Sequence, residues 1–298
     1  MNTTILVAGA SGNLGHRIVD ALLARGATVR ALVRPGTDPA KLTDLTRRGV
    51  EIAPAEYADL AQLTQACRGA ACVVSALQGL RDVVVDAQSA LLEAALAAGV
   101  PRFIPSDFSS DYTRQPAGEN RNFDLRREFN AHLDARPIAA TSILNGAFGE
   151  ILTYNIPLLN FKSQTVGYWD DADYRIDFTT MDDTAAYTAA AALDASTPRL
   201  LRIASFQISP REVAAVAEQV VGEPFQLVKM GTRAELGAQN RQQRAAQPEG
   251  EHELYPRWQQ SQYLLSMFSV QNQPLDNDRY AGLSWTPAAD VLRARHQR

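Results

Sequence analysis

The chain has little of several features that mark whole classes of proteins. Its 298 residues include only two cysteines and four histidines. Cys67 and Cys72 alone make no disulfide framework and fit a reducing compartment, and the scattered histidines form no metal-ligand cluster. No apolar run reaches the roughly eighteen residues that a membrane span needs, and no basic segment precedes the first strand-like run, as a signal peptide would require. We expect a cytoplasmic protein without a metal site.

The chain also has little net charge. Its 29 Lys and Arg against 33 Asp and Glu give −4, which provides no general attraction to nucleic acid or to an anionic membrane. Its apolar fraction of 46% is enough for a substantial core. We therefore expect a globular protein that binds neither nucleic acid directly nor a membrane.

The most informative segment that is present lies at the amino terminus. A strand-like run, Thr3–Ala8, breaks into a glycine-rich loop, and an apolar helical pattern follows at Ile18–Leu23. Glycines at a 3+3 spacing in such a loop make the tight turn, let backbone N–H groups reach a pyrophosphate, and let the helix pack closely. The helix N-terminus also favours phosphate. We interpret the loop as a dinucleotide-binding loop, with predicted contacts at Gly9, Ser11, Gly12, Asn13, Leu14 and Gly15.

Strand-like and helix-like segments alternate over residues 1–150, with Thr141–Leu144 as the sixth strand. This alternation predicts an α/β protein with a Rossmann-type doubly wound parallel sheet, whose ligands bind beyond the carboxyl ends of the strands. The alternation stops after residue 150. We expect 1–150 to form the nucleotide-binding domain and 151–298 a smaller substrate-side domain, and leave open whether part of 174–204 returns to the Rossmann sheet. Arg233–Gln247 is polar, and is either a solvated helix or a mobile segment.

The end of the second predicted strand indicates which coenzyme binds. NAD sites usually carry Asp or Glu there, for the ribose 2′-hydroxyl, whereas this chain has Arg34. A guanidinium binds a 2′-phosphate through charge-assisted hydrogen bonds, and Lys41 can add a second positive charge. We therefore predict NADP(H) rather than NAD(H). The alternative is that Arg34 is an ordinary surface arginine beside a turn.

Four segments together resemble the NmrA-like group of atypical short-chain dehydrogenases, which contains the isoflavone reductase-like enzymes. They are the glycine loop, Leu32–Pro35, Val74–Gly79 and Arg102–Phe108. The group includes reductases of isoflavones, phenylcoumaran benzylic ethers and pinoresinol or lariciresinol, and also NADP-sensing regulators without catalysis. The resemblance implies that Arg34 and Lys41 contact the 2′-phosphate. It also implies that the coenzyme passes residues that follow the fourth and fifth strands: Ser75, Ala76, Leu77, Gln78, Gly79, Ser106 and Phe108.

The chain departs from these reductases at the catalytic position. Their lysine on the following helix is replaced here by Arg126, and no Tyr-x-x-x-Lys pair exists. Arginine stays charged at any workable pH, so it is a poor general base, but it can stabilise an oxyanion. Asp107 stands where the reductases usually carry Glu, and either positions substrate, relays protons or caps the following turn. Asn122 and Asn130 flank Arg126 at i±4, which predicts either a polar substrate contact or a solvated outer face.

Two hypotheses for function remain open. The first is an oxidoreductase: an NADPH-dependent reductase of a small substrate that is aromatic or carries a carbonyl or benzylic ether. The second is a non-catalytic NADP(H)-sensing regulatory protein that engages a protein partner. The missing lysine favours this second hypothesis. Either protein could be a monomer or a homodimer. For a reductase we expect a substrate pocket edged by Asn145 and Phe148 and walled by Tyr168 and Trp169.

Overall fold

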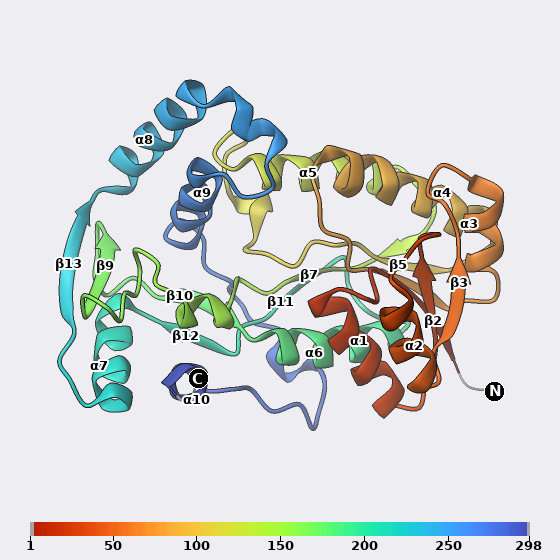
Figure 1. The fold of residues 1–298 in the computed structure, drawn as a ribbon, viewed down its shortest axis with the longest axis horizontal. Coiled ribbons are helices and arrows are strands. Elements are labelled where there is room, and N and C mark those ends of the chain that lie inside the picture. Colours follow the sequence, from red (N-terminus) through yellow and green to blue (C-terminus); the bar gives the residue numbers. More distant parts are fainter. Residues whose placement is uncertain (1–2, 297–298) are drawn as a thin grey trace. The chain divides into compact units, whose positions relative to one another are not determined.

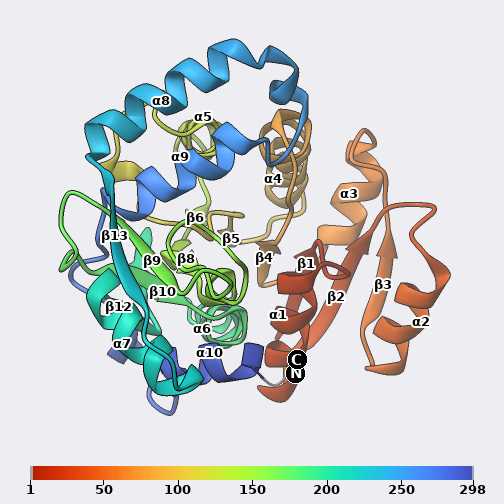
Figure 2. The same ribbon diagram turned by 60° about the vertical axis from the view of Figure 1, so that its left-hand side comes forward.

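A six-stranded parallel sheet is the central element of the structure. The structure is a computed structural model that describes residues 3–296, and its sheet has the order β3-β2-β1-β4-β5-β6 (Figure 1). Figure 2 shows β4, β1, β2 and β3 side by side. Every neighbouring pair runs parallel, which confirms the predicted doubly wound sheet. The strands are β1 Thr4–Ala8, β2 Thr28–Val33, β3 Glu51–Pro54, β4 Cys72–Ser75, β5 Arg102–Ile104 and β6 Ala139–Ala140.

Helices alternate with these strands. A cluster of buried apolar side chains joins one face of the sheet to α3, α4 and α5, while α1 packs on β1 and β2. Cys67 and Cys72 are buried free thiols. A π-helical turn, Asp82–Ala87, directly precedes α4. The helices are α1 Asn13–Ala24, α2 Pro39–Arg47, α3 Leu60–Cys67, α4 Gln88–Ala97, α5 Arg121–Asp134 and α6 Met181–Leu193.

The chain forms two compact units. The first contains Met1–Asp107, Leu125–Ile143 and Thr184–Leu201, and the second contains Phe108–Asp124, Leu144–Asp183 and Arg202–Arg298. The sheet and the glycine loop belong to the first unit. Whether residues 151–298 serve as a substrate-side domain stays a prediction.

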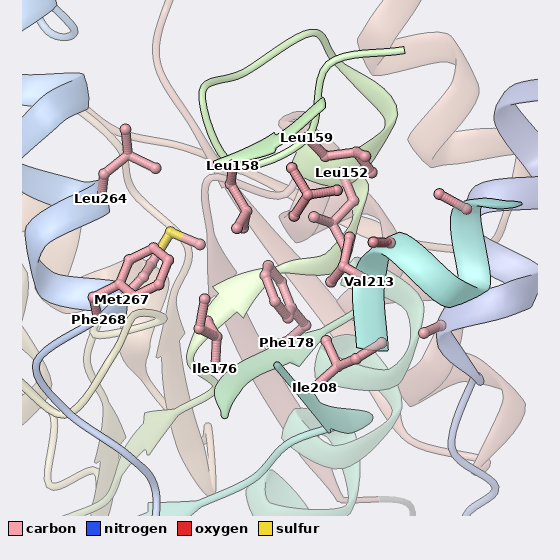
Figure 3. Packing of buried hydrophobic residues seen from close by; sticks show 14 of the residues in the cluster. Leu152, Leu158, Leu159, Ile176, Phe178, Ile208, Val213, Leu264, Met267 and Phe268 are labelled. Atoms are coloured by element: carbon pink, nitrogen blue, oxygen red, sulfur yellow. The ribbon is translucent and has the colours of Figure 1, made fainter. Parts of the chain in front are cut away.

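The second unit has its own core. Ile176 and Phe178 of β10 pack there with Ile208 of β12 and Val213 of α7, as Figure 3 shows. A three-stranded sheet, β12-β10-β8, and a parallel pair, β13-β9, support this core. The elements are β8 Ala147–Phe148, β9 Thr165–Trp169, β10 Ile176–Thr179, β12 Phe206–Ile208, α7 Pro210–Val221, β13 Gln226–Gly231, α8 Arg233–Ala246, α9 Arg257–Met267 and α10 Ala288–His296.

Side-chain caps explain where several helices begin. Asp59, the N-cap of α3, accepts a hydrogen bond from the backbone N–H of Gln62 at 3.0 Å. Ser209 forms a capping box with Glu212 at the start of α7, and Thr232 does the same with Glu235 at the start of α8. Arg233–Gln247 is therefore a helix rather than an irregular segment.

The segment expected as the sixth strand, Thr141–Leu144, does not belong to the six-stranded sheet. Ala139–Ala140 forms β6 beside β5, whereas Ser142–Leu144 forms β7 and pairs with β11, Leu200–Arg202. β5 ends at Ile104, directly before Pro105. The backbone N–H of Ser142 donates instead to the carbonyl of Arg199 at 2.8 Å. A strand does lie within Thr141–Leu144, but it pairs with β11, and the sixth strand of the sheet is Ala139–Ala140 instead.

Two classes of feature are absent from residues 3–296. No helix there is both long enough and apolar enough to cross a bilayer. No group of three or more His, Cys, Asp or Glu side chains in that range is arranged to hold a metal ion.

One buried carboxyl group should make the stability of the second unit depend on pH. Asp177 in β10 is 4% exposed, and burial raises its pKa from 3.8 to about 6, against the opposing effect of hydrogen bonds from Gln207 and the backbone of Asn272. Between these two pKa values the folded chain holds a proton that the unfolded chain has lost. The free energy of unfolding therefore falls as pH rises from about 4 to about 6, by up to roughly 3 kcal/mol.

We predict that Asp177→Asn removes this fall. Urea unfolding of the wild type and of Asp177→Asn at pH values across the window should give a stability difference, wild type minus variant, that decreases as pH rises. The exposed Asp173 is the control, because its hydrogen bond to Arg211 lowers its pKa, so Asp173→Asn should give a small trend of opposite sign. A difference for Asp177→Asn that is flat or rises with pH contradicts the prediction.

Candidate functional site

The glycine loop brings the start of α1 against the end of β1. Gly9 has φ +79°, the left-handed region, and a Cβ there would lie 2.6 Å from the carbonyl oxygen of Ala76. Gly12 donates its N–H to the carbonyl of Gly9 at 2.9 Å. A Cβ on Gly15 would lie 2.1 Å from that same carbonyl oxygen. Gly9 is thus required by its turn and Gly15 by its close approach, whereas Gly12 has an ordinary φ of −83°.

The N-terminus of α1 has no side-chain cap. Gly12, its N-cap, has no side chain to satisfy the first N–H groups, and no acidic residue lies in the first turn. These N–H groups and the helix dipole are suited to an anion. Side chains cap several other helices instead, among them those of Asp38, Asp59, Ser209 and Thr232.

The end of β4 lies beside this loop. Ser75 pairs in register with Ala8, and the N–H of Ala76 donates to the carbonyl of Ala8 at 2.9 Å. The hydroxyl oxygen of Ser75 is fully buried and has no hydrogen-bond partner within the described chain. A buried polar atom without a partner is costly. Ser75 and the glycine loop therefore present unsatisfied polar groups at the point where the strand order reverses.

Two cations at the end of β2 and the start of α2 are free of partners. Arg34 and Lys41 are exposed, and neither side chain makes a hydrogen bond or ion pair with residues 3–296. Arg34 is near Tyr57: burial raises the pKa of the Tyr57 phenol, and the charge of Arg34 opposes that rise. Arg34 and Lys41 are therefore both available to pair with an anion.

A cavity of about 290 Å³ adjoins the loop. It is lined by Ser11 and His16 of the loop and α1, and by Ala40, Lys41, Asp44 and Leu45 of α2. The one carboxylate in this lining, Asp44, pairs with Arg48 at 3.0 Å. Lys41 is therefore the cation that remains available to an anion in the cavity.

Ser106 joins the segment after β5 to the segment after β4. Its hydroxyl donates to the carbonyl of Leu77 at 2.6 Å, and its N–H donates to Gln88 at 2.9 Å. Gln88 is the first residue of α4, and its amide also donates to the carbonyl of Val84 in the preceding π-helical turn, at 2.9 Å. This links Ser106 to the predicted Ser75–Gly79 path.

Asp107 is wholly buried in the first unit. Its Oδ2 accepts hydrogen bonds from Asn130 Nδ2 at 2.9 Å and from the hydroxyl of Ser142 at 2.5 Å. Arg126 is half-buried, and its carbonyl accepts a second N–H from Asn130 at 2.9 Å. The structure thus brings together Asp107 and the turn of α5 that carries Arg126. Asn122 and Asn130 are each buried, so the Asn-Arg-Asn face is not a solvated one.

The remaining expected residues lie in the second unit. Phe108 is buried, Phe148 and Tyr168 are half-buried, and Trp169 packs edge-on against Phe268 with ring centroids 5.2 Å apart. Trp169 therefore belongs to the core of this unit. Asn145, after β7, is wholly buried, and neither atom of its side-chain amide has a hydrogen-bond partner within residues 3–296. A pocket formed by these residues stays a prediction.

Two residues beside Asp107 were missed in the sequence. Ser142 donates to Asp107, and Arg199 donates to Ser142 at 2.6 Å and to Asn130. Arg199 is distant along the chain from both, so no local spacing connects them. Only the turn of the chain from β6 into the β7–β11 pairing brings them together.

Comparison with known proteins agrees with this architecture. The model of the NmrA-like family matches residues 1–239. Pinoresinol reductase 2 of Arabidopsis thaliana is 32% identical over 63% of this chain and 63% of its own length. The match thus spans less than two thirds of that relative. A bifunctional pinoresinol-lariciresinol reductase of Linum perenne is 30% identical over 76% of this chain and 78% of its own.

Among solved structures, the binary complex of leucoanthocyanidin reductase with NADPH from Vitis vinifera superposes with a TM-score of 0.83. It covers 99% of this chain and 100% of that chain at 20% identity. At that identity the likeness shows a common fold.

We predict that Gly15→Ala destabilises the protein. An alanine normally stabilises a helix relative to glycine by up to about 1 kcal/mol, but here the Cβ would overlap the carbonyl of Gly9, at a cost of about 2 kcal/mol. Gly237→Ala in α8 is the matched control, because its Cβ would meet neighbours at 3.5 Å, and should be neutral or stabilising. Urea unfolding without ligand measures both, and equal effects would contradict the steric explanation.

Proposed function

Because the chain belongs to the NmrA-like family, we propose that it is an NADPH-dependent reductase of a small aromatic substrate that carries a carbonyl or benzylic-ether group. The observation that carries the proposal is the set of unsatisfied polar groups around the switch point of the sheet: an uncapped α1, the partnerless Ser75 hydroxyl and the free cations Arg34 and Lys41. This set fits the charges of a phosphorylated dinucleotide.

Different residues of the first unit suit different chemical groups of this coenzyme. The N–H groups of the glycine loop and of the first turn of α1 would hold the pyrophosphate. Arg34 and Lys41 would hold the 2′-phosphate, with Lys41 facing the cavity beside Ser11. Ser75 would supply a hydroxyl further along, in the segment that continues to Gly79. When bound, the reduced nicotinamide supplies a hydride.

The proposed substrate class rests on the relatives and on the second unit. Both curated relatives are named as reductases of pinoresinol, or of pinoresinol and lariciresinol. Phe148 and Tyr168 are only partly buried, so their rings remain able to contact an aromatic molecule. Asn145 offers an amide donor and acceptor that no described residue uses.

Arg126 would stabilise charge rather than move a proton. A guanidinium keeps its charge at any workable pH, so it neither takes a proton from the substrate nor gives one to it. It can stabilise negative charge that develops on a substrate oxygen, a contribution of typically 100- to 1,000-fold in rate for a well-placed donor. The proton that completes the product would then come from water.

The second candidate is an NADP(H)-sensing regulator without catalysis. Arg126 in place of lysine is the observation that favours it. Both candidates need the same coenzyme site and fit a cytoplasmic protein, and they differ in whether the bound coenzyme is consumed.

The test is turnover. Purified protein is mixed with NADPH and each member of a panel of aromatic carbonyl compounds and benzylic ethers. It should oxidise NADPH, which is measured as the loss of NADPH absorbance. Arg126→Ala should lower kcat by about 100-fold and leave the Kd for NADPH unchanged, whereas Arg127→Ala, on the neighbouring position of the helix, should change kcat little. Tight NADPH binding with no turnover of any substrate rejects the reductase in favour of the regulator.

We predict that Arg34→Ala removes the preference for the phosphorylated coenzyme. Loss of a charge-assisted contact to phosphate should raise the Kd for NADPH by roughly 10- to 100-fold and leave the Kd for NADH unchanged. Calorimetry with each coenzyme measures both constants. Arg25→Ala is the control, since Arg25 is likewise exposed but lies at the other end of α1. A preference for NADPH that survives in Arg34→Ala contradicts the assignment.

A further inference from the structure

We propose that Arg199 is a positioning residue for the reduction, because it fixes the orientation of Asn130 and through it the turn of α5 that carries Arg126. The inference rests on the proposed function and concerns only residues of the first unit. Arg199 does not contact the coenzyme loop. It acts through two side chains that lie between it and Asp107.

The guanidinium of Arg199 donates to three acceptors. Nη1 donates to the hydroxyl oxygen of Ser142 at 2.6 Å, Nη2 donates to Oδ1 of Asn130, and Nε donates to Asp134 at 2.7 Å. The first two acceptors lie in the interior, whereas Asp134 is exposed. Arg199 therefore has an inner arm directed at Ser142 and Asn130 and an outer arm directed at Asp134.

Donation from Arg199 decides the direction of the next hydrogen bonds. A guanidinium has donors and no acceptor, so the oxygen of Asn130 must face it and the NH₂ group must face away. That NH₂ group donates to Asp107 and to the carbonyl of Arg126, each at 2.9 Å. In the same way the hydroxyl of Ser142 accepts a hydrogen bond from Arg199 and donates one to the carboxylate of Asp107.

The alternative orientation of Asn130 is disfavoured on both sides. A flipped amide would direct its oxygen at the carboxylate of Asp107 and at the Arg126 carbonyl, and its NH₂ at the guanidinium. Every one of these contacts would place like partial charges together. Arg199 thus locks a single arrangement in which the Asn130 amide bridges Asp107 to the backbone of Arg126.

The backbone around Arg199 is itself held in place. Its carbonyl accepts the N–H of Ser142 at 2.8 Å. Two residues earlier, Thr197 accepts a hydrogen bond from Arg102 at 2.7 Å and makes another with Thr141 at 2.7 Å. Arg102 also donates to the carbonyls of Ala191 and Ala192. The segment between α6 and β11 therefore presents the guanidinium in a fixed position.

The consequence for catalysis is a separation between rate and binding. Arg126 needs a defined position to stabilise a developing charge, and a misplacement of about 1 Å can cost about 100-fold in rate. The coenzyme contacts at the glycine loop and Arg34 do not involve Arg199. Loss of Arg199 should therefore lower kcat and leave coenzyme binding unchanged.

The test compares Arg199→Met, which keeps much of the bulk without donors, with Asp134→Asn, which removes only the acceptor of the outer arm. Arg199→Met should lower kcat by roughly 10- to 100-fold with the KM for NADPH within about twofold. Arg199→Lys, which keeps the charge but not the fork of donors, should be intermediate. Asp134→Asn should retain the wild-type kcat. If Arg199 only stabilises the fold, Arg199→Met will lower the unfolding midpoint and leave the kcat of the folded enzyme unchanged, which overturns the proposal.

A second measurement does not need turnover. Amide hydrogen exchange over residues 125–133 should be faster in Arg199→Met than in the wild type and unchanged in Asp134→Asn. Should Arg199→Met fail to fold, Asn130→Ala cuts the same connection with Arg199 in place and should reproduce both effects. A wild-type protein that binds NADPH but reduces nothing refutes the reductase, whereas unchanged exchange in the folded variant refutes the role of Arg199.

Discussion

The approach of Gly15 to the carbonyl oxygen of Gly9 is the contact on which the arrangement of the first unit depends. With no side chain at residue 15, α1 starts directly at the end of β1. Its uncapped first turn therefore lies at the edge of the sheet where β4 also ends, with Ser75 in register with Ala8. The sheet order reverses between these two strands. One missing Cβ thus helps to determine where unsatisfied donors collect, and the proposed pyrophosphate site follows from that position.

The fold was predictable because its signals are local. Buried parallel strands such as Cys72–Ser75 are short apolar runs, and glycines and N-caps such as Asp59 mark the ends of elements. The position of the sixth strand at Ala139–Ala140 was not predictable, because it depends on where β5 ends, directly before Pro105. The residues proposed to bind the coenzyme were chosen from motifs. The surroundings of Asp107 were not predictable, because Asn130, Ser142 and Arg199 are brought together by tertiary pairing alone.

The arginines of this chain fall into two groups with different consequences. Arg102 and Arg121 are buried and donate mostly to backbone carbonyls, so they fasten segments of chain to one another. Arg34 is exposed and makes no such bond within residues 3–296. An arginine that serves structure already has its N–H donors satisfied by its partners, whereas one without partners is available to a ligand. This difference, rather than the residue type, supports the assignment of Arg34.

The two thiols limit how a protein of this design can respond to oxidants. Both are buried, and burial raises the pKa of Cys67 and of Cys72 to about 12. Thiolate is the species that peroxides attack, and at physiological pH almost none of it would form here. For the proposed reductase, a response to the cellular redox state would therefore reach the protein through the ratio of reduced to oxidised dinucleotide rather than through its two cysteines.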